Sequence, residues 1–155
     1  TPKILYQRPA NLFVATFIGH TNVVDSKLEV EGDDAYLVIN DKKFKLDNVL
    51  DEEKVSQNVK ASIRPEELVV SRDDTTGLKA VVDDAVFLGL NTHYFVHLEN
   101  GEKLEIIQES KIDSIISKNT EIYLTIKTEK INVFKEDGSK NIIKGVTNDY
   151  DVYKA

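Results

Sequence analysis

Hydrophobic and polar residues alternate along most of the chain, with the period of two that is typical of strands half buried in a sheet. In the first half this alternation predicts strands at 28–30, 36–39, 44–46, 59–63 and 68–70. Turn-forming residues separate them, as at Gly32-Asp33-Asp34 and Asn40-Asp41. The polar residues 47–57 predict a loop with room for one helical turn.

The second half repeats this pattern more clearly. A long strand is expected from Leu78 to Leu88, broken at Asp83-Asp84 and ended by Gly89. Residues 94–98 and 103–107 flank Asn100-Gly101, a sequence that strongly favours a hairpin turn. Closing strands are expected at 122–126 and 131–134, after a short helix or turn at Ile112–Ser117.

The alternation predicts one helix, near the start of the chain. Pro9 suits a first helical position, and Phe13/Phe17 and Val14/Ile18 recur at the four-residue spacing of one helix face. Gly19 is a good stop signal. Because the segment is apolar nearly all round, it is either buried against its own barrel or faces another domain in part.

The pattern therefore predicts a mainly all-β chain of about ten short strands, spaced about 8–12 residues apart, with one N-terminal helix. A small OB-fold-like barrel fits this spacing best. With 155 residues, the chain suits one domain or two small lobes that share a core.

The composition limits the kinds of chemistry and the kinds of partner that are expected of the chain. The absence of cysteine excludes disulfides and thiol catalysis. The absence of methionine leads us to expect that Thr1 lies inside a longer polypeptide. The net charge is −7, and the lysines are scattered among acidic residues rather than gathered in a basic stripe, so nucleic acid is not an expected partner. No apolar run reaches the roughly 20 residues that span a bilayer.

Catalytic motifs are missing from the sequence. It contains no GxxxxGK[ST], no GxGxxG and no HExxH pattern, so no P-loop site is expected in this fragment. His93 and His97 share a face of one strand but lie about 13 Å apart, which argues against a metal site. The acidic residues sit mostly at turns, and a paired-carboxylate hydrolase stays open as an alternative.

The segment Ile63-Arg64-Pro65-Glu66-Glu67-Leu68 has two interpretations. It is either a rigid strand connector held by an Arg–carboxylate pair, or a polar loop presented to a partner or ligand. We take Arg64, Glu66 and Glu67, with His93 and Tyr94, as the candidate ligand-binding or partner-binding residues.

Several of these segments, taken together and in order, resemble a known family. Pro9 to Gly19 resembles the segment that follows the nucleotide-binding domain in ABC importer ATPases of the maltose, iron and spermidine/putrescine type, and Thr1-Pro2-Lys3 with Tyr6 matches the end of that domain. The other matches are to the TOBE barrel of that family: Ile63-Arg64-Pro65-Glu66, Phe87-Leu88-Gly89 followed by Tyr94, and Ile131-Asn132-Val133-Phe134.

The resemblance implies a C-terminal, non-catalytic regulatory and dimerisation domain. The parent protein would be a transport ATPase whose missing domain binds ATP and Mg, while this fragment holds no cofactor. Its partners would be its own ATPase domain, a second copy and the permease subunits, at the cytoplasmic face of the membrane. The turn from Gly89 to Tyr94 resembles the polyamine branch, which implies spermidine/putrescine uptake.

The resemblance also suggests a division of the chain. Residues 1–19 would be a connector and helix from the ATPase domain, 20–134 the TOBE barrel, and 135–155 an extension beyond the usual closing strand. The alternative to a transporter domain is a free-standing OB-fold module for a small ligand or oligonucleotide.

Overall fold

The computed structural model describes residues 8–110 and 115–146, and within them the chain is mainly β, as predicted. One helix, α1 (Leu12–Ile18), precedes all the strands. The strands are β1 (Asn22–Glu31), β2 (Asp34–Ile39), β3 (Lys42–Leu46), β4 (Gln57–Ile63), β5 (Leu68–Ser71), β6 (Leu78–Leu88), β7 (Asn91–Leu98), β8 (Lys103–Glu109), β9 (Glu121–Ile126) and β10 (Asn132–Lys135). The helical turn expected within 47–57 is the short 3₁₀ helix η1 (Asp51–Glu53).

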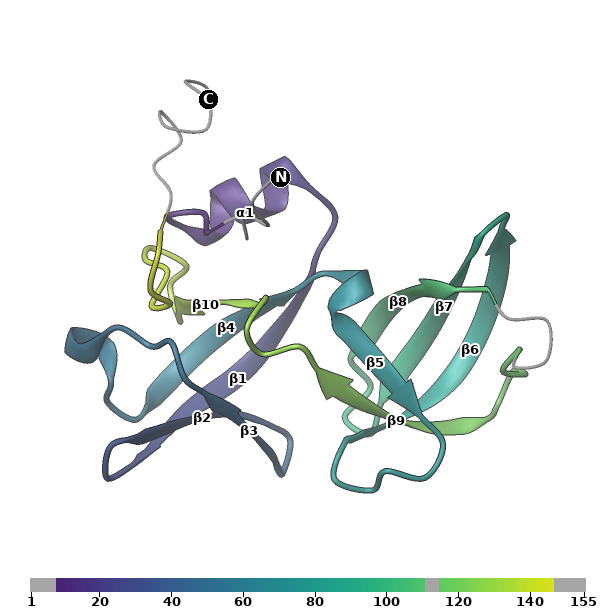
Figure 1. The fold of residues 1–155 in the computed structure, drawn as a ribbon, viewed down its shortest axis with the longest axis horizontal. Coiled ribbons are helices and arrows are strands. Elements are labelled where there is room, and N and C mark those ends of the chain that lie inside the picture. The colour runs from purple at the N-terminus through teal and green to yellow at the C-terminus, as the bar shows by residue number, and fades with distance from the viewer. Residues whose placement is uncertain (1–7, 111–114, 147–155) are drawn as a thin grey trace, which may run out of the picture.

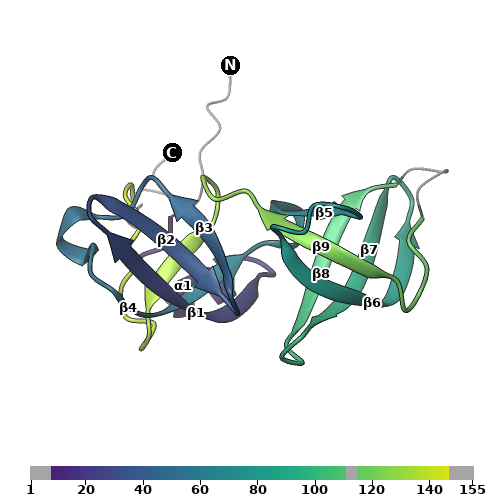
Figure 2. The same cartoon turned by 90° about the horizontal axis from the view of Figure 1, so that it is seen from below.

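The strands form two five-stranded antiparallel sheets, arranged as two lobes side by side (Figures 1 and 2). The first lobe holds the sheet β10-β4-β1-β2-β3, and the second lobe holds β5-β9-β6-β7-β8. The chain enters the second lobe through the 3₁₀ helix η2 (Pro65–Glu67), between β4 and β5. It returns after β9 to place β10 beside β4, so two connections cross between the lobes.

Inward and outward residues alternate along the strands because successive side chains point to opposite faces. Along β7, residues Thr92, Tyr94, Val96 and Leu98 are buried, and the residues between them are more exposed. The break expected at Asp83-Asp84 is a bulge, and β6 continues past it to Leu88. The expected hairpin at Asn100-Gly101 is present, with Gly101 at a φ of 88° that an L side chain rarely adopts.

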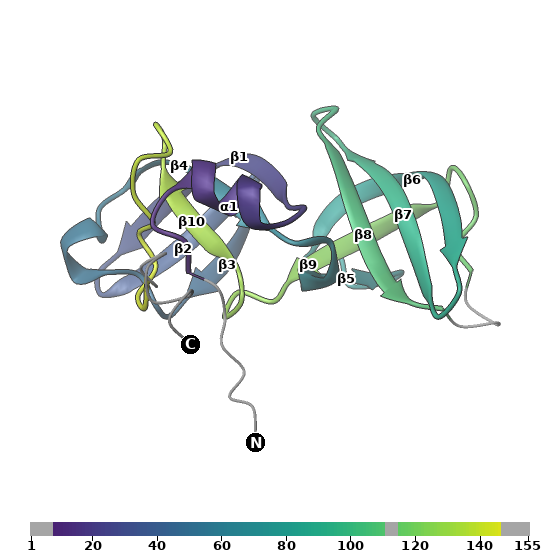
Figure 3. The ribbon, with the colours of Figure 1, turned by 90° about the horizontal axis from the view of Figure 1, so that it is seen from above.

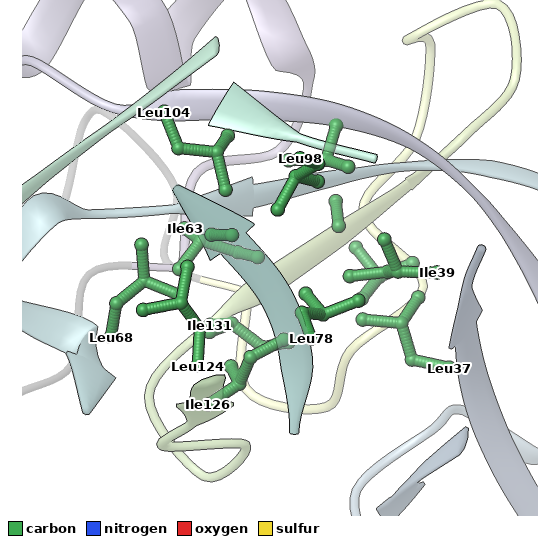
Figure 4. Close-up of a cluster of buried hydrophobic side chains, with 14 of the residues drawn as sticks. Leu37, Ile39, Ile63, Leu68, Leu78, Leu98, Leu104, Leu124, Ile126 and Ile131 are labelled. Carbon is green, nitrogen blue, oxygen red and sulfur yellow. The ribbon is translucent and has the colours of Figure 1, made fainter. Parts of the chain in front are cut away.

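The buried side chains form one cluster that continues from one lobe into the other (Figure 4). Ile63 at the end of β4 and Ile131 before β10 meet Leu68 and Leu124 of the second lobe. Of these residues, Ile63, Leu68 and Ile131 adjoin the two connections between the lobes. The lobes are therefore joined by apolar packing as well as by the backbone.

The helix differs from its prediction at its start and in its burial. It begins at Leu12 because Asn11 caps it: the Asn11 side-chain oxygen accepts the Val14 N–H at 2.9 Å. Gly19 ends the helix, as expected, in an extended conformation with φ 173°. Of the two alternatives for this helix, burial of the whole segment against its own barrel is wrong, because Phe13 is 75% exposed and Phe17 is 81% exposed. That part of it faces another domain stays a prediction.

The residues after β10 pack onto the first lobe as far as they are described. Ile142 and Ile143 are fully buried, and Ile143 forms an isolated β-bridge with Val49. The rest of the predicted extension, residues 147–155, lies outside the described residues, as do Thr1-Pro2-Lys3, Tyr6 and part of Ile112–Ser117. Among the described helices, none has the length and apolar character needed to cross a bilayer.

Candidate functional site at the junction of the lobes

The first connection between the lobes is η2 (Pro65–Glu67), with Arg64 as the residue that precedes and caps it. Pro65 occupies the first helical position, where its missing N–H costs nothing. The Glu67 carboxylate reaches back and accepts the Arg64 backbone N–H at 2.8 Å. This bond closes the short turn and so fixes the direction in which the chain passes from β4 into β5.

Glu67 is the most perturbed acid of this connection. It is 8% exposed, and burial raises the pKa of its carboxyl to about 7. The hydrogen bond from the Arg64 backbone opposes that rise in pKa but does not cancel it. Glu53, which is equally buried, shows the opposite: a hydrogen bond from Lys135 lowers its pKa. The surroundings of Glu67 therefore do not fully offset the cost of ionising its buried carboxyl.

The second connection between the lobes is fixed by Arg8. Its guanidinium is buried and donates to the carbonyl oxygens of Glu129, Lys130 and Ile131 and to the Asn132 side-chain oxygen, the last at 3.1 Å. These bonds satisfy carbonyl groups of a loop segment that lies inside the junction.

The two connections also touch each other. The Lys127 backbone N–H donates to the Glu67 carbonyl at 3.0 Å, and the charge of Arg8 acts on Glu67. The crossing segments thus form one hydrogen-bonded unit rather than two independent linkers. A relative movement of the lobes would have to break this unit.

A histidine cluster lies at the same junction. His20, just before β1, and His93 on β7 both contact one oxygen of Glu105 on β8, His93 at 3.2 Å. Asn22 completes the contact between lobes, because its side chain donates to the Glu105 carbonyl and accepts the Glu105 N–H, each at 2.9 Å. Strand β8 packs against η2, so this cluster adjoins the Arg64–Glu67 turn.

The five predicted site residues do not all lie together in the structure. Arg64, Glu67 and His93 lie at the junction, with the Arg64 guanidinium packed close to Gly19. Glu66 is exposed, and its carbonyl accepts from the Lys127 side chain at 3.3 Å. Tyr94 is only 2% exposed, in the core of the second lobe. A ligand-binding or partner-binding role for the five residues stays a prediction.

Sequence reasoning missed His20, Asn22 and Glu105. His20 and Glu105 are 85 residues apart in sequence, and no local pattern marks either of them. His97, which shares a strand face with His93, pairs separately with Asp83 at 2.8 Å. Across the described ranges, no group of three or more His, Cys, Asp or Glu side chains is placed to hold a metal ion.

A shallow groove of about 510 Å³ on the first lobe is lined mainly by charged and amide side chains, namely Asp25, Lys27, Glu29, Asn40, Asn58, Lys60 and Glu136. None of the five predicted residues lines it. Small-molecule pockets are usually apolar with a few polar groups, and this groove has the reverse character. The junction, rather than the groove, is therefore the best-organised polar feature of this part of the chain.

Comparison with known proteins shows which proteins this chain is similar to. A family model described as the TOBE domain matches residues 61–134. An Fe(3+) ions import ATP-binding protein of Fusobacterium nucleatum is 56% identical over 149 residues, which cover 96% of this chain and 39% of that protein. A spermidine/putrescine import ATP-binding protein of Thermotoga maritima is 30% identical over 139 residues, covering 81% of this chain and 37% of the relative.

The chain spans less than two fifths of the length of either relative. Among solved structures, the molybdate-bound cytoplasmic molybdate-binding protein ModG matches with a TM-score of 0.59, covering 74% of this chain and 95% of that one. Its sequence identity is 11%, so the likeness shows the fold alone. It is consistent with the OB-like architecture of the two sheets.

Proposed function

The chain carries a TOBE domain and is a homologue of the ATP-binding subunits of ABC importers, and on this premise we propose that it is the non-catalytic regulatory part of such a subunit. The observation that carries the proposal is the 56% identity, which runs along 96% of the chain but along only 39% of the relative. The remaining length of the parent protein would supply the ATP-binding domain, with ATP and Mg as its cofactors.

We propose ferric iron as the transported solute of the parent. The relative at 56% identity is named for Fe(3+) import, whereas the relative from Thermotoga maritima, named for spermidine/putrescine import, matches at 30%. This preference replaces the polyamine branch suggested by the turn from Gly89 to Tyr94. Polyamine uptake stays the second candidate, because several spermidine/putrescine import ATP-binding proteins match, including one of Rubrobacter xylanophilus that is 36% identical over 107 residues.

The mechanism we propose is that of a clamp at the cytoplasmic face of the membrane. Two copies of the parent would stay in contact through these domains while their ATPase domains open and close on the permease subunits. Such tethering raises the effective concentration of the partners without new chemistry. The hydrogen bonds that Glu67, Arg8 and Glu105 make at the junction support this role. A clamp must transmit force between its lobes without bending.

The test is solute uptake in a strain that lacks the gene of the parent protein. Loss of radiolabelled ferric iron uptake, with spermidine and putrescine uptake retained, is the expected result. The reverse pattern would move the assignment to the polyamine branch. Unchanged uptake of all three solutes, with no effect on ATP-driven transport, would contradict the importer assignment itself.

The clamp is tested separately by light scattering on the full-length parent across a concentration series. A molar mass that stays at twice that of the subunit without nucleotide is expected. A strict monomer without nucleotide would mean that these domains do not hold the subunits together.

A further inference from the structure

Two sets of titratable side chains lie on the contacts that join the lobes. Glu67 is buried in the first connection, where its side chain and its carbonyl accept backbone N–H groups from the first and the second connection. His20, His93 and Glu105 form the other set, which we call the histidine cluster. Strand β8 carries Glu105 and packs against η2, so the two sets adjoin each other. Figure 3 shows β8 on the side of the second lobe that faces the first lobe.

The histidine cluster bridges the two lobes through a single oxygen atom. The Nε2 atoms of His20, just before β1, and of His93 on β7 both contact Oε2 of Glu105, His93 at 3.2 Å. The His93 ring stacks on Phe95, with ring centroids 4.8 Å apart, so its position is fixed from within the second lobe. Asn22 holds the Glu105 backbone through two further bonds of 2.9 Å. The Glu105 carboxylate therefore lies between one imidazole of each lobe.

Loss of protons weakens the junction at both sets of side chains. Burial raises the pKa of the Glu67 carboxyl to about 7 from an ordinary value of 4.5, so ionisation of Glu67 favours an open junction in which water reaches the carboxylate. An imidazole ordinarily gains its charge between about pH 5 and 8, and a charged donor makes a hydrogen bond roughly twice as strong as a neutral one. The bonds to Glu105 therefore weaken over the pH range in which Glu67 becomes a buried charge.

We propose that the junction is a proton-sensitive lock: protonation of Glu67 and of the histidine cluster holds the lobes together, and loss of these protons as the pH rises through neutrality lets the junction open. The proposal goes beyond the proposed function and is independent of it, because it concerns contacts within this chain. The elements packed around the two sets also carry Arg8, Arg64, Glu66, Asp84, Lys103 and Lys127. Side chains of these types ordinarily keep their charge between about pH 6 and 8.5, so they act on the lock without switching it.

The chain offers a matched control for the histidine cluster. His97 shares a strand face with His93 and pairs with Asp83 at 2.8 Å, and both partners of this pair belong to the second lobe. A change of charge at this pair leaves the contacts between the lobes in place. His97→Gln is therefore the control variant, whereas Glu67→Gln and Glu105→Gln remove the two carboxyls of the lock and keep their shape.

The experiment measures hydrogen exchange by NMR at three amides whose hydrogen bonds belong to the junction. Glu67 accepts the N–H groups of Arg64 and Lys127, through its side chain and its carbonyl. The Glu105 N–H is bonded to the Asn22 side chain. Dividing each exchange rate by the intrinsic rate at the same pH gives an opening constant for that amide. The most slowly exchanging amides of each sheet report global unfolding in the same sample.

The opening constants of the three amides should rise at least about tenfold between about pH 6 and 8.5, because a carboxyl whose pKa moves from 4.5 to about 7 on closure accounts for that factor by itself. The three amides should exchange faster than the slowest amides of the sheets, since the junction opens while the lobes stay folded. In the double variant Glu67→Gln/Glu105→Gln the rise should fall below about twofold, because neither carboxyl remains to titrate. His97→Gln should keep the full rise.

Opening constants that do not change with pH in the wild-type chain would overturn the proposal. A rise that persists in the double variant, or one that is lost in His97→Gln, would overturn it too. The same holds if the three amides exchange only as slowly as the slowest amides of the sheets, because the junction would then have no opening of its own. Glu67→Gln alone keeps an acceptor for the Arg64 N–H, and it tests the lock even where the double variant does not fold. An undiminished rise at Arg64 and Lys127 in this single variant would overturn the proposal.

Discussion

Replacing Glu67 by glutamine removes a titrating group from the junction while keeping its shape. Glutamine retains a side-chain oxygen that accepts the Arg64 backbone N–H, so the η2 turn can form as before. What the variant loses is the carboxyl whose pKa is raised by burial to about 7. The comparison of the two proteins therefore isolates the effect of ionising this one buried group.

The expected magnitude follows from the two pKa values of Glu67. In the unfolded chain the carboxyl has its ordinary pKa of 4.5, and in the folded chain the pKa is about 7. Between these values the folded state holds the proton more tightly, so stability is fully present below pH 4.5 and is lost as the pH rises to 7. That interval corresponds to at most about 3.4 kcal/mol. The glutamine variant should not lose this stability.

The assay is urea unfolding of the wild-type chain and of Glu67→Gln at several values of pH between about 5 and 8.5. The stability of the variant relative to the wild type should rise by about 2–3 kcal/mol across this range and level off above pH 7.5. Glu66→Gln, at the exposed neighbouring position, is the control and should show a flat difference. A difference for Glu67→Gln that is the same at both ends of the range would refute the argument from burial.

Three further substitutions test the fold. Ile131→Ala, in the core shared by the lobes, should lower the free energy of unfolding by about 2–5 kcal/mol. The control, Leu90→Ala at an exposed position, should lower it by less than about 0.5 kcal/mol, and similar losses for the two variants would contradict a core that continues from one lobe into the other. Gly101→Ala should cost about 1–2 kcal/mol in thermal unfolding, because alanine is strained at φ 88°, and an unchanged melting temperature would argue against the assigned turn. Asn11→Ala should lower the free energy of unfolding by about 1 kcal/mol, because it removes the cap of α1, and should speed up hydrogen exchange at the Val14 amide. Unchanged exchange at Val14 would show that the cap is dispensable.

The strands were predictable because their signals are local. Alternation of apolar and polar residues indicates a strand within each of β1 to β10, although it predicted only 28–30 of β1, and Asn100-Gly101 marks one turn with its own chemistry. The start of the helix was misplaced because Pro9 and Asn11 are both acceptable near a helix start, and only the hydrogen bond to Val14 decides between them. How the strands divide between two sheets depends on pairings such as β10 with β4, which join residues distant in sequence.

The candidate site was predictable only in part, because some of its residues are brought together from distant parts of the sequence. The Arg64-Pro65-Glu66-Glu67 motif is contiguous and could be singled out directly. His93 was selected with it, but its partners His20 and Glu105 come from elements that meet only after folding. The exposure of Phe13 and Phe17 was also hidden, because an apolar helix has the same sequence whether it faces a core or a partner.

The most direct test of the central claim is the rate of ATP hydrolysis by the purified full-length parent and by the present chain alone. The account predicts turnover by the parent and none by the chain, because the chain has no GxxxxGK[ST] loop and would be the non-catalytic part of a transport ATPase. Turnover by the chain alone would contradict that claim, and so would a parent protein that does not hydrolyse ATP.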